Sequence, residues 1–317
     1  MCDAMVHRGP DGAGVWTAPG IGLGHRRLSI IDLAGSPQPM QSADGRAVIV
    51  FNGEIYNFQE LRRELAQLGH AFRTEGDTEV ILAAWQRWGP ACLSRLNGMF
   101  AFALYDLTER TLFLARDRLG VKPLFLAHLS DGSIAFASEL KGLLAHPLLR
   151  RDIDPLAIED YLAWGYVPDH RSFLKGVEKM PAGHYRLLHH GRDPSPPVQW
   201  WDVSFAERRK GGEADLSAEL LHLLRQAVTS RMVADVPLGA FLSGGVDSSS
   251  VVALMAETSR EPVRTCSIGF DVASLDETSY AGKVAGLFHT DHRSRVVGSD
   301  DFTEIDRLAA MFDEPFA

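Results

Sequence analysis

The chain has 317 residues, of which 45% are hydrophobic and 23% charged, with a formal net charge of −9 at pH 7. This length predicts two domains with sizeable cores, and the acidic balance excludes nonspecific nucleic-acid binding, which requires a basic surface. The absence of an apolar run of ~18 residues, of a signal-peptide pattern and of more than three scattered cysteines predicts a cytoplasmic protein without a membrane span or a disulfide framework.

The first elements are short and polar. Residues 1–6 have the composition of a helix end, which the turn-forming run Gly9-Pro10-Asp11-Gly12 would stop. Residues 23–32 predict a strand that carries the adjacent pair Arg26-Arg27. The Arg27 guanidinium could bind a carboxylate through two parallel hydrogen bonds. On its own, an exposed arginine pair is more often a solvated strand edge.

An apolar strand is predicted over residues 47–51, ending at Asn52-Gly53. The side-chain amide of Asn52 and the backbone N–H of Gly53 are donors of the kind that an oxyanion hole uses. Asn-Gly is also the commonest hairpin turn. The two residues alone therefore favour a turn.

Helices are predicted next over residues 59–68 and 80–88, and Asp77 before the second is either its N-cap or a ligand for a substrate ammonium. Short strands follow over 99–105, 112–115, 124–127 and 134–137, then a short helix from Ser138, a helix over 155–167 and a hairpin over 179–188. Many short strands with few crossovers indicate an antiparallel α+β layer architecture.

A Pro-rich spacer over 192–198 and a charged, Gly-containing stretch over 207–215 mark the domain boundary. We therefore expect a first domain over residues 1–203, a linker over 204–215 and a second domain over 216–317. Helices over 216–232, 250–257, 276–288 and 300–312 alternate there with strands over 236–242, 263–270 and 292–297. This alternation predicts a doubly wound parallel sheet, whose ligand would lie at the C-terminal strand ends.

The second domain contains the loop Ser243-Gly244-Gly245-Val246-Asp247-Ser248-Ser249 between a predicted strand and helix. Glycines let the backbone approach a phosphate closely, and a helix N-terminus supplies free N–H groups and a positive dipole end. The serines add hydroxyl donors, and Asp247 is placed to hold the Mg²⁺ of a nucleotide. The loop lacks the Lys of a Walker A motif. A Ser/Gly-rich structural turn is the alternative.

The chain resembles a known family in six blocks. Five blocks in the first domain resemble the class II glutamine amidotransferase domain, and the serine-glycine loop resembles the pyrophosphate loop of the ATP-pyrophosphatase superfamily. The blocks are His7-Arg8-Gly9-Pro10-Asp11, Arg27-Leu28-Ser29-Ile30, Asn52-Gly53-Glu54-Ile55-Tyr56-Asn57, Gly98-Met99-Phe100-Ala101-Phe102-Ala103, Arg116-Asp117-Arg118-Leu119-Gly120 and the Ser243–Ser249 loop. Together they are similar to glutamine-hydrolysing asparagine synthetases, and within these to the exosortase-associated amidotransferase subgroup.

This resemblance implies an N-terminal-nucleophile-type α+β sandwich of antiparallel sheets and helices, followed by an α/β ATP-pyrophosphatase domain. It implies a ligase that takes ammonia from glutamine, adenylates aspartate or a related carboxylate with ATP and Mg²⁺, and forms the amide. The resemblance is also compatible with a homodimer. The implied glutamine-binding residues are Arg27, Leu28, Ser29, Ile30, Ile31, Asn52, Gly53, Glu54 and Asp77, with Asn52 and Gly53 as the oxyanion hole. The implied ATP-binding residues are Leu242, Ser243, Gly244, Gly245, Val246, Asp247, Ser248, Ser249 and Ile268, with Asp247 also holding Mg²⁺. Leu242 and Ile268 are equally compatible with core positions.

The catalytic thiol is the departure from the family pattern. Family members begin with a Cys after the initiator Met, followed by Gly and an apolar strand, and the His-Arg-Gly-Pro block comes a few dozen residues later. Here Cys2 precedes Asp3 and lies five positions before His7. We therefore expect Cys2 to be a helical residue without a catalytic role, the chain to lack both ends of the family pattern, and this fragment to be inactive as a glutaminase. Cys92 and Cys266 lie in apolar stretches and are expected in the core.

Two rival functions remain open on the sequence alone. One is a ligase of the β-lactam synthetase type with a vestigial glutaminase, against which the presence of Arg27, Asn52, Gly53 and Asp77 argues. The other is a noncatalytic module that binds glutamine or a nucleotide.

Overall fold

The computed structural model describes residues 1–298, 306 and 310–315. These residues form two compact units, one containing residues 1–203 and 312–315, and the other containing the described residues from 204 to 311. The helix predicted over 300–312 falls largely outside the described residues. None of the helices in the described part of the chain is long and apolar enough to cross a membrane.

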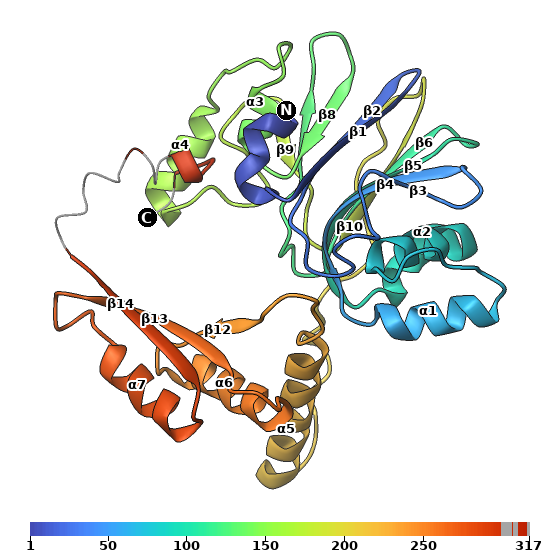
Figure 1. Ribbon diagram of the computed structural model, residues 1–317. Coiled ribbons are helices and arrows are strands. Elements are labelled where there is room, and N and C mark those ends of the chain that lie inside the picture. The colour runs from blue at the N-terminus through green and yellow to red at the C-terminus, as the bar shows by residue number, and fades with distance from the viewer. Residues whose placement is uncertain (299–305, 307–309, 316–317) are drawn as a thin grey trace. The chain divides into compact units, whose positions relative to one another are not determined.

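The first unit is built around a six-stranded antiparallel sheet in the order β11-β10-β6-β5-β4-β3 (Figure 1). A two-stranded sheet pairs β1 with β2, and a three-stranded sheet has the order β8-β7-β9. The antiparallel α+β prediction is thereby confirmed. The strands are β1 (Gly12–Ala18), β2 (Ile21–Arg27), β3 (Met40–Gln41), β4 (Ala47–Ile55), β5 (Gly98–Asp106), β6 (Thr111–Arg116), β7 (Phe125–His128), β8 (Ile134–Ala137), β9 (Val177–Lys179), β10 (His184–His189) and β11 (Val198–Gln199).

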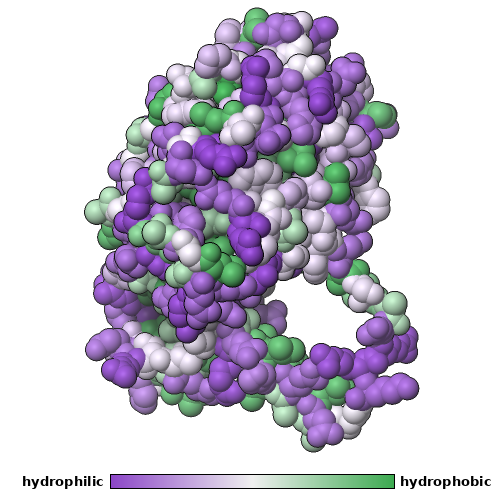
Figure 2. Space-filling view, turned by 90° about the vertical axis from the view of Figure 1, so that its right-hand side faces the viewer, coloured by the Kyte–Doolittle hydropathy of each residue, from purple (hydrophilic) through white to green (hydrophobic). Residues whose placement is uncertain are grey.

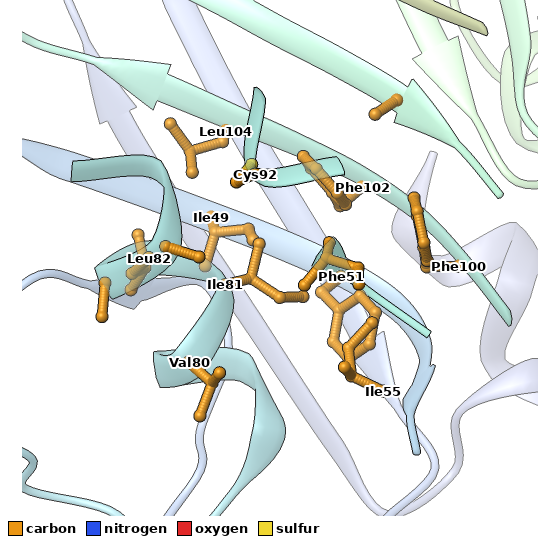
Figure 3. Packing of buried hydrophobic residues seen from close by; sticks show 14 of the residues in the cluster. Ile49, Phe51, Ile55, Val80, Ile81, Leu82, Cys92, Phe100, Phe102 and Leu104 are labelled. Atoms are coloured by element: carbon orange, nitrogen blue, oxygen red, sulfur yellow. The ribbon is translucent and has the colours of Figure 1, made fainter. Parts of the chain in front are cut away.

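Side chains alternate between the two faces of this sheet. On β4, Ile49 and Phe51 join one buried cluster, whereas Val48 and Val50 join another. Strand period two explains this division, because successive side chains point to opposite faces. Figure 3 shows the first cluster, in which Phe51 lies beside residues of β5 and of helix α2. Both faces of the sheet are therefore buried.

Helices α1 (Phe58–Gln67) and α2 (Asp77–Trp88) cover the first face. Strands β2 and β7 cover the other, and beyond them lie α3 (Leu140–Leu144) and the 3-10 helix η1 (Cys2–Arg8), which contact each other (Figure 1). The order of layers is helix, sheet, sheet, helix. The unit also contains η2 (Gly89–Arg95) and α4 (Pro155–Trp164).

Two local predictions for this unit are wrong. The hairpin predicted over 179–188 does not form, because β9 pairs with β7 and β10 pairs with β6 and β11. The Asn52-Gly53 turn does not form either, because β4 continues through both residues to Ile55. A Cβ on Gly53 would lie 2.2 Å from the Met99 carbonyl oxygen, so glycine there permits close strand pairing rather than a turn.

The second unit contains a parallel sheet in the order β12-β13-β14, and its parallel strands confirm the pattern predicted from strand–helix alternation. Helices α5 to α7 pack one on the next through two buried clusters. Helices α5, α6 and α7 lie on the face of the sheet where alternate side chains of β13 are buried, and the doubly wound arrangement stays a prediction. The elements are α5 (Glu213–Ser230), β12 (Gly239–Phe241), α6 (Val246–Thr258), β13 (Arg264–Phe270), α7 (Thr278–Leu287) and β14 (Asp291–Val297).

The burial of the two remaining cysteines differs. Cys92 is fully buried, as predicted, but Cys266 is exposed, and its assignment to the core is wrong. Burial along β13 alternates strictly, and Cys266 lies on the face turned away from the helices. The molecular face in Figure 2 is mainly hydrophilic, with scattered hydrophobic patches.

Candidate functional site

The first unit contains a cavity of about 400 Å³. Its walls come from η1, β2, β4, β5, the start of α2 and the segments around Lys122 and Ser138. Of the nine residues predicted for glutamine, the wall contains Arg27, Leu28, Ile30, Ile31, Asn52, Gly53, Glu54 and Asp77. Ser29 is not part of it, and its backbone N–H donates to Asp11 Oδ2 at 2.8 Å. Residues from positions 27 to 77 are thus brought to one cavity.

The edge of β4 directs backbone donors toward this cavity. The Phe51 N–H donates to Gln38 Oε1 at 2.6 Å, and the Ile55 N–H donates to Asp77 Oδ2 at 3.0 Å. Alternate N–H groups of a strand point to the same side. The Gly53 N–H, midway between them, therefore points to the same side as these two, where Gln38 and Asp77 both line the cavity.

Asn52 supplies a second donor. Its Nδ2 atom is buried, and no described residue accepts a hydrogen bond from it. A buried amide without a partner is rare in folded proteins, because it costs the desolvation of the group. An acceptor entering the cavity would satisfy it. Together, Asn52 Nδ2 and the Gly53 N–H can act as the two donors of an oxyanion hole.

Asp77 is the first residue of α2 and is 7% exposed. The N-cap of this helix is Gly76, so the alternative that Asp77 is the N-cap is wrong. Burial raises the pKa of Asp77 to about 6, against the lowering effect of the Ile55 N–H, and the nearby charge of Glu54 raises it further. A cationic group entering the cavity would restore the charged carboxylate.

Arg27 organises the loop that follows β2. Its guanidinium donates to the backbone carbonyl oxygens of Ile31, Asp32 and Leu33 at 3.1, 2.7 and 2.8 Å. These three bonds leave the Nε–H and one Nη1–H group, which point to different sides, so a ligand carboxylate can accept from one of them. The same guanidinium therefore fixes the loop after β2 and offers a donor to a ligand.

The sequence pattern did not predict several other residues that line the cavity. His25 Nε2 lies 2.9 Å from the Phe51 carbonyl oxygen, and burial lowers the pKa of this histidine. Burial and the charge of Arg8 lower the pKa of Lys122. His25 stands two positions before Arg27 on β2, so strand periodicity would have placed both on one face. No comparable local signal marked Gln38 or Lys122.

The segment around His7 and Arg8 also reaches the cavity wall. His7 Nε2 and Arg8 Nη1 each lie 2.8 Å from a carboxylate oxygen of Glu139, which precedes α3. Cys2 begins η1, and its Sγ atom lies against Gly24, where an added Cβ would come within 2.4 Å of it. Cys2 is not one of the residues that line the cavity.

The loop between β12 and α6 forms the second candidate site. Gly244 has φ +85°, and a Cβ there would lie 2.5 Å from Tyr280 Cβ, so only glycine fits. Gly245 is the N-cap of α6 and gives no side-chain cap. Ser243 Oγ lies 3.0 Å from Ser248 Oγ. Ser249 Oγ is buried, and no described residue is within hydrogen-bonding reach of it. The loop thus offers donors at a helix N-terminus.

The other predicted nucleotide ligands divide by exposure. Val246 and Asp247 are exposed in the first turn of α6, and Ile268 is 57% exposed. Leu242 is 1% exposed and packs in the core with Val252, so only its backbone can face a ligand. The described residues contain no group of three His, Cys, Asp or Glu side chains placed to hold a metal ion. A single carboxylate such as Asp247 nevertheless suits Mg²⁺ that is bound mainly by phosphates.

Comparisons with known proteins find similar families for both parts of the chain. The family described as "Glutamine amidotransferase domain" matches residues 1–201, and the family described as "Asparagine synthase" matches residues 219–317. Glutamine-hydrolysing asparagine synthetases 1 and 3 of Bacillus subtilis are both 34% identical to this chain, covering 100% and 96% of it and 50% and 52% of their own length. A Mycobacterium tuberculosis protein, whose name proposes the same activity, is 39% identical over 99% of this chain and 50% of its own. The chain spans about half the length of these relatives.

Proposed function

The chain belongs to the glutamine amidotransferase domain family and has the domain order of the glutamine-hydrolysing asparagine synthetases, and from this premise we propose that it contributes to a glutamine-dependent amidoligase. In this proposal the first unit belongs to the N-terminal-nucleophile type and supplies the glutamine site and the oxyanion donors of the half-reaction that releases ammonia. The second unit takes the ATP-pyrophosphatase role. The acceptor is aspartate or a related carboxylate, and cytoplasmic location and a homodimer stay predictions.

The cavity of the first unit supports the glutaminase half. Asp77 would pair with the α-ammonium of glutamine, and a remaining N–H group of Arg27 would donate to its α-carboxylate. The side-chain carbonyl oxygen would then lie at Asn52 Nδ2 and the Gly53 N–H, where negative charge develops as the carbonyl carbon becomes tetrahedral. Net addition of water at that carbon then breaks the C–N bond, the leaving nitrogen takes a proton from the water, and the products are ammonia and glutamate. The unpartnered, buried Asn52 amide is the observation that carries this proposal.

The loop of the second unit supports the ligase half. An acceptor carboxylate oxygen attacks the α-phosphorus of ATP, pyrophosphate leaves, and ammonia then displaces AMP to give the amide. Gly244, Gly245 and the N-terminus of α6 would bind the phosphates through backbone N–H groups, and Ser249 Oγ would gain the partner it lacks. Mg²⁺ held by Asp247 would neutralise phosphate charge.

The proposal predicts that glutamine binding depends on the charge of Asp77. Its pKa of about 6 means that the carboxylate is charged above this pH and neutral below it. The Kd for glutamine should therefore be constant above pH 7 and rise by up to about tenfold for each unit below pH 6. Calorimetric titration of the chain with glutamine between pH 5 and 8 measures this directly.

The matched variant is Asp77→Asn, which keeps the shape of the side chain. It should bind glutamine more weakly at pH 8 and show no dependence on pH between 5 and 8. A wild-type Kd that does not change with pH would remove Asp77 from the ammonium site. No detectable glutamine binding at pH 8 by the wild-type chain would contradict the glutaminase proposal itself, and would favour a vestigial first unit.

Cys2 is predicted to have no catalytic role. Its thiol lies at the start of η1 against Gly24, and Cys2 is not among the residues that line the cavity with Asn52 and Gly53, although Gly24 is; a nucleophile needs near-attack geometry to those donors. Diazo-oxo-norleucine, an electrophilic glutamine mimic, should leave Cys2 unlabelled in this chain, as judged by peptide mass spectrometry. Stoichiometric labelling of Cys2 that glutamine prevents would show that this assignment is wrong.

A further inference from the structure

A row of hydrogen-bonded side chains runs across the sheet of the second unit and ends just before the β12–α6 loop. Thr265 and Ser267 lie on the buried face of β13 and are 3% and 7% exposed. Register pairs Thr265 with His292 on β14. The His292 ring spans the two hydroxyls, with Nδ1 at 2.9 Å from Thr265 Oγ1 and Nε2 at 3.3 Å from Ser267 Oγ. Thr290 Oγ1 adds one more hydrogen bond to this row, at 2.8 Å from Thr265 Oγ1.

The direction of every hydrogen bond in this row follows from the last one, between Ser267 and the Leu242 carbonyl. Ser267 Oγ lies 2.6 Å from the Leu242 carbonyl oxygen, which can only accept, so the serine proton points there. Ser267 must then accept from His292, which places a proton on Nε2. In the neutral ring, Nδ1 therefore accepts from Thr265, and Thr265 accepts from Thr290. A single tautomer of His292 satisfies all four contacts.

The row of hydrogen bonds ends at Leu242, the residue from which the loop begins. Pairing between β12 and β13 ends at Phe241 and Cys266, followed by one further backbone bond from the Leu242 N–H to the Cys266 carbonyl oxygen at 2.9 Å. The Leu242 carbonyl is bound by the Ser267 hydroxyl. Leu242 therefore has both its backbone donor and its backbone acceptor held by β13. The chain turns at once into Ser243 and Gly244, whose φ is +85°.

We propose that His292 and Ser267 are positioning residues for the phosphate loop: the Nε2–H tautomer of His292 orients the Ser267 hydroxyl, which holds the Leu242 carbonyl and thereby sets the backbone N–H groups of Ser243 to Gly245. This inference rests on the ATP half of the proposed function for its purpose, but not for its geometry. Neither His292 nor Ser267 contacts the nucleotide in this assignment. Their effect passes through one carbonyl group.

The tautomer can be tested without ATP. Long-range ¹H–¹⁵N spectra of the full chain labelled at histidine nitrogen distinguish a ring protonated on Nε2 from one protonated on Nδ1. The expected result is an Nε2–H ring for His292 whose proton signal is lost in Ser267→Ala. A ring carrying its proton on Nδ1 would overturn the proposal, since Ser267 would then lack its donor.

Three substitutions test the link to the loop. The Gln side-chain nitrogen can replace His Nε2 as a donor to Ser267, whereas the Asn nitrogen reaches only the position of Nδ1. His292→Gln should therefore keep the amide resonances of Gly244 and Gly245 and the Kd for Mg-ATP within about twofold of wild type. His292→Asn and Ser267→Ala should shift those resonances and weaken Mg-ATP binding by roughly 5- to 10-fold, the value of one ordinary hydrogen bond.

Thr258→Val is the matched control, because its hydroxyl bonds to the Leu254 and Met255 carbonyls at the far end of α6. It should change neither the loop resonances nor Mg-ATP binding. Thermal unfolding of each variant shows whether a loss merely reflects instability. Equal losses in His292→Gln and His292→Asn, or an unshifted loop in Ser267→Ala, would overturn the positioning role. A wild-type chain that does not bind Mg-ATP would contradict the ATP half of the proposed function, while the resonance shifts would still decide the positioning role.

Discussion

Replacing Asn52 by alanine is expected to lower glutamine-dependent turnover by about 10²- to 10³-fold, the cost of one oxyanion-hole donor. The Asn52 amide is buried and has no acceptor among the described residues. It lies on β4 next to Gly53, and both line the cavity that contains Asp77. The loss should fall mainly on kcat, because the bond strengthens only when the carbonyl oxygen becomes negative. The assay requires a polypeptide that contains this chain and hydrolyses glutamine.

Two comparisons separate this role from a structural one. Amide formation with free ammonia as the nitrogen source bypasses the oxyanion and should be nearly unchanged in Asn52→Ala. Asn57→Ala is the matched control, since the Asn57 side chain bonds to the Arg95 carbonyl and the Asn97 N–H away from the cavity. It should leave the ratio of glutamine- to ammonia-dependent rates unchanged. Equal losses with both nitrogen sources in Asn52→Ala would mean that Asn52 supports the fold only.

Replacing Asp247 by alanine is expected to reduce ATP–pyrophosphate exchange by at least about 10²-fold, since a metal contributes several kcal/mol of charge stabilisation at a phosphoryl group. Asp247 is exposed in the first turn of α6, directly after the Gly244-Gly245 turn. There its carboxylate can reach a metal bound to phosphates without displacing a structural contact. Exchange of labelled pyrophosphate into ATP, in a polypeptide that contains this chain and is active in exchange, measures the effect.

Glu257→Ala removes a carboxylate from the other end of the same helix. Glu257 pairs with Arg225 at 2.9 Å, and its side chain is 52% exposed, so its loss should cost little. Exchange should therefore stay near wild type in Glu257→Ala, and glutamine hydrolysis should stay largely intact in Asp247→Ala. Wild-type exchange in Asp247→Ala would remove the metal role from this residue. Raising the Mg²⁺ concentration should recover part of the exchange if the carboxylate acts through the metal.

The order of the units and most elements follow from local sequence pattern. Leu61 and Leu65 recur at helical spacing in α1, and both are buried as that spacing requires. The serine-glycine loop opens α6, as its composition predicts. Each of these features depends on neighbours within a few positions, so the sequence contains the needed information. The predicted glutamine residues also line one cavity except for Ser29, and that grouping came from the family resemblance rather than from local pattern.

Other features depend on residues far apart in the chain, and local pattern could not decide them. Asn52-Gly53 forms part of a strand rather than a hairpin turn because Gly53 lies opposite Phe100 on β5, where a Cβ would collide with the partner backbone. Asp77 is a buried carboxylate of raised pKa rather than an N-cap, because it meets the Ile55 N–H across 22 positions. Strand partners likewise override the hairpin that adjacent turn residues predicted.

The sequence by itself therefore determined which chemical groups the protein has and in what order: an amide, a carboxylate and an arginine in the first unit, and a phosphate-type loop in the second. Only the tertiary structure decided the state of those groups. Burial leaves the Asn52 amide without an acceptor among the described residues and raises the pKa of Asp77. A row of hydroxyl groups hydrogen-bonded to His292 holds the Leu242 carbonyl. The physical reason is that desolvation and hydrogen-bond direction depend on every neighbour in space, and these neighbours come from strands far apart in the chain.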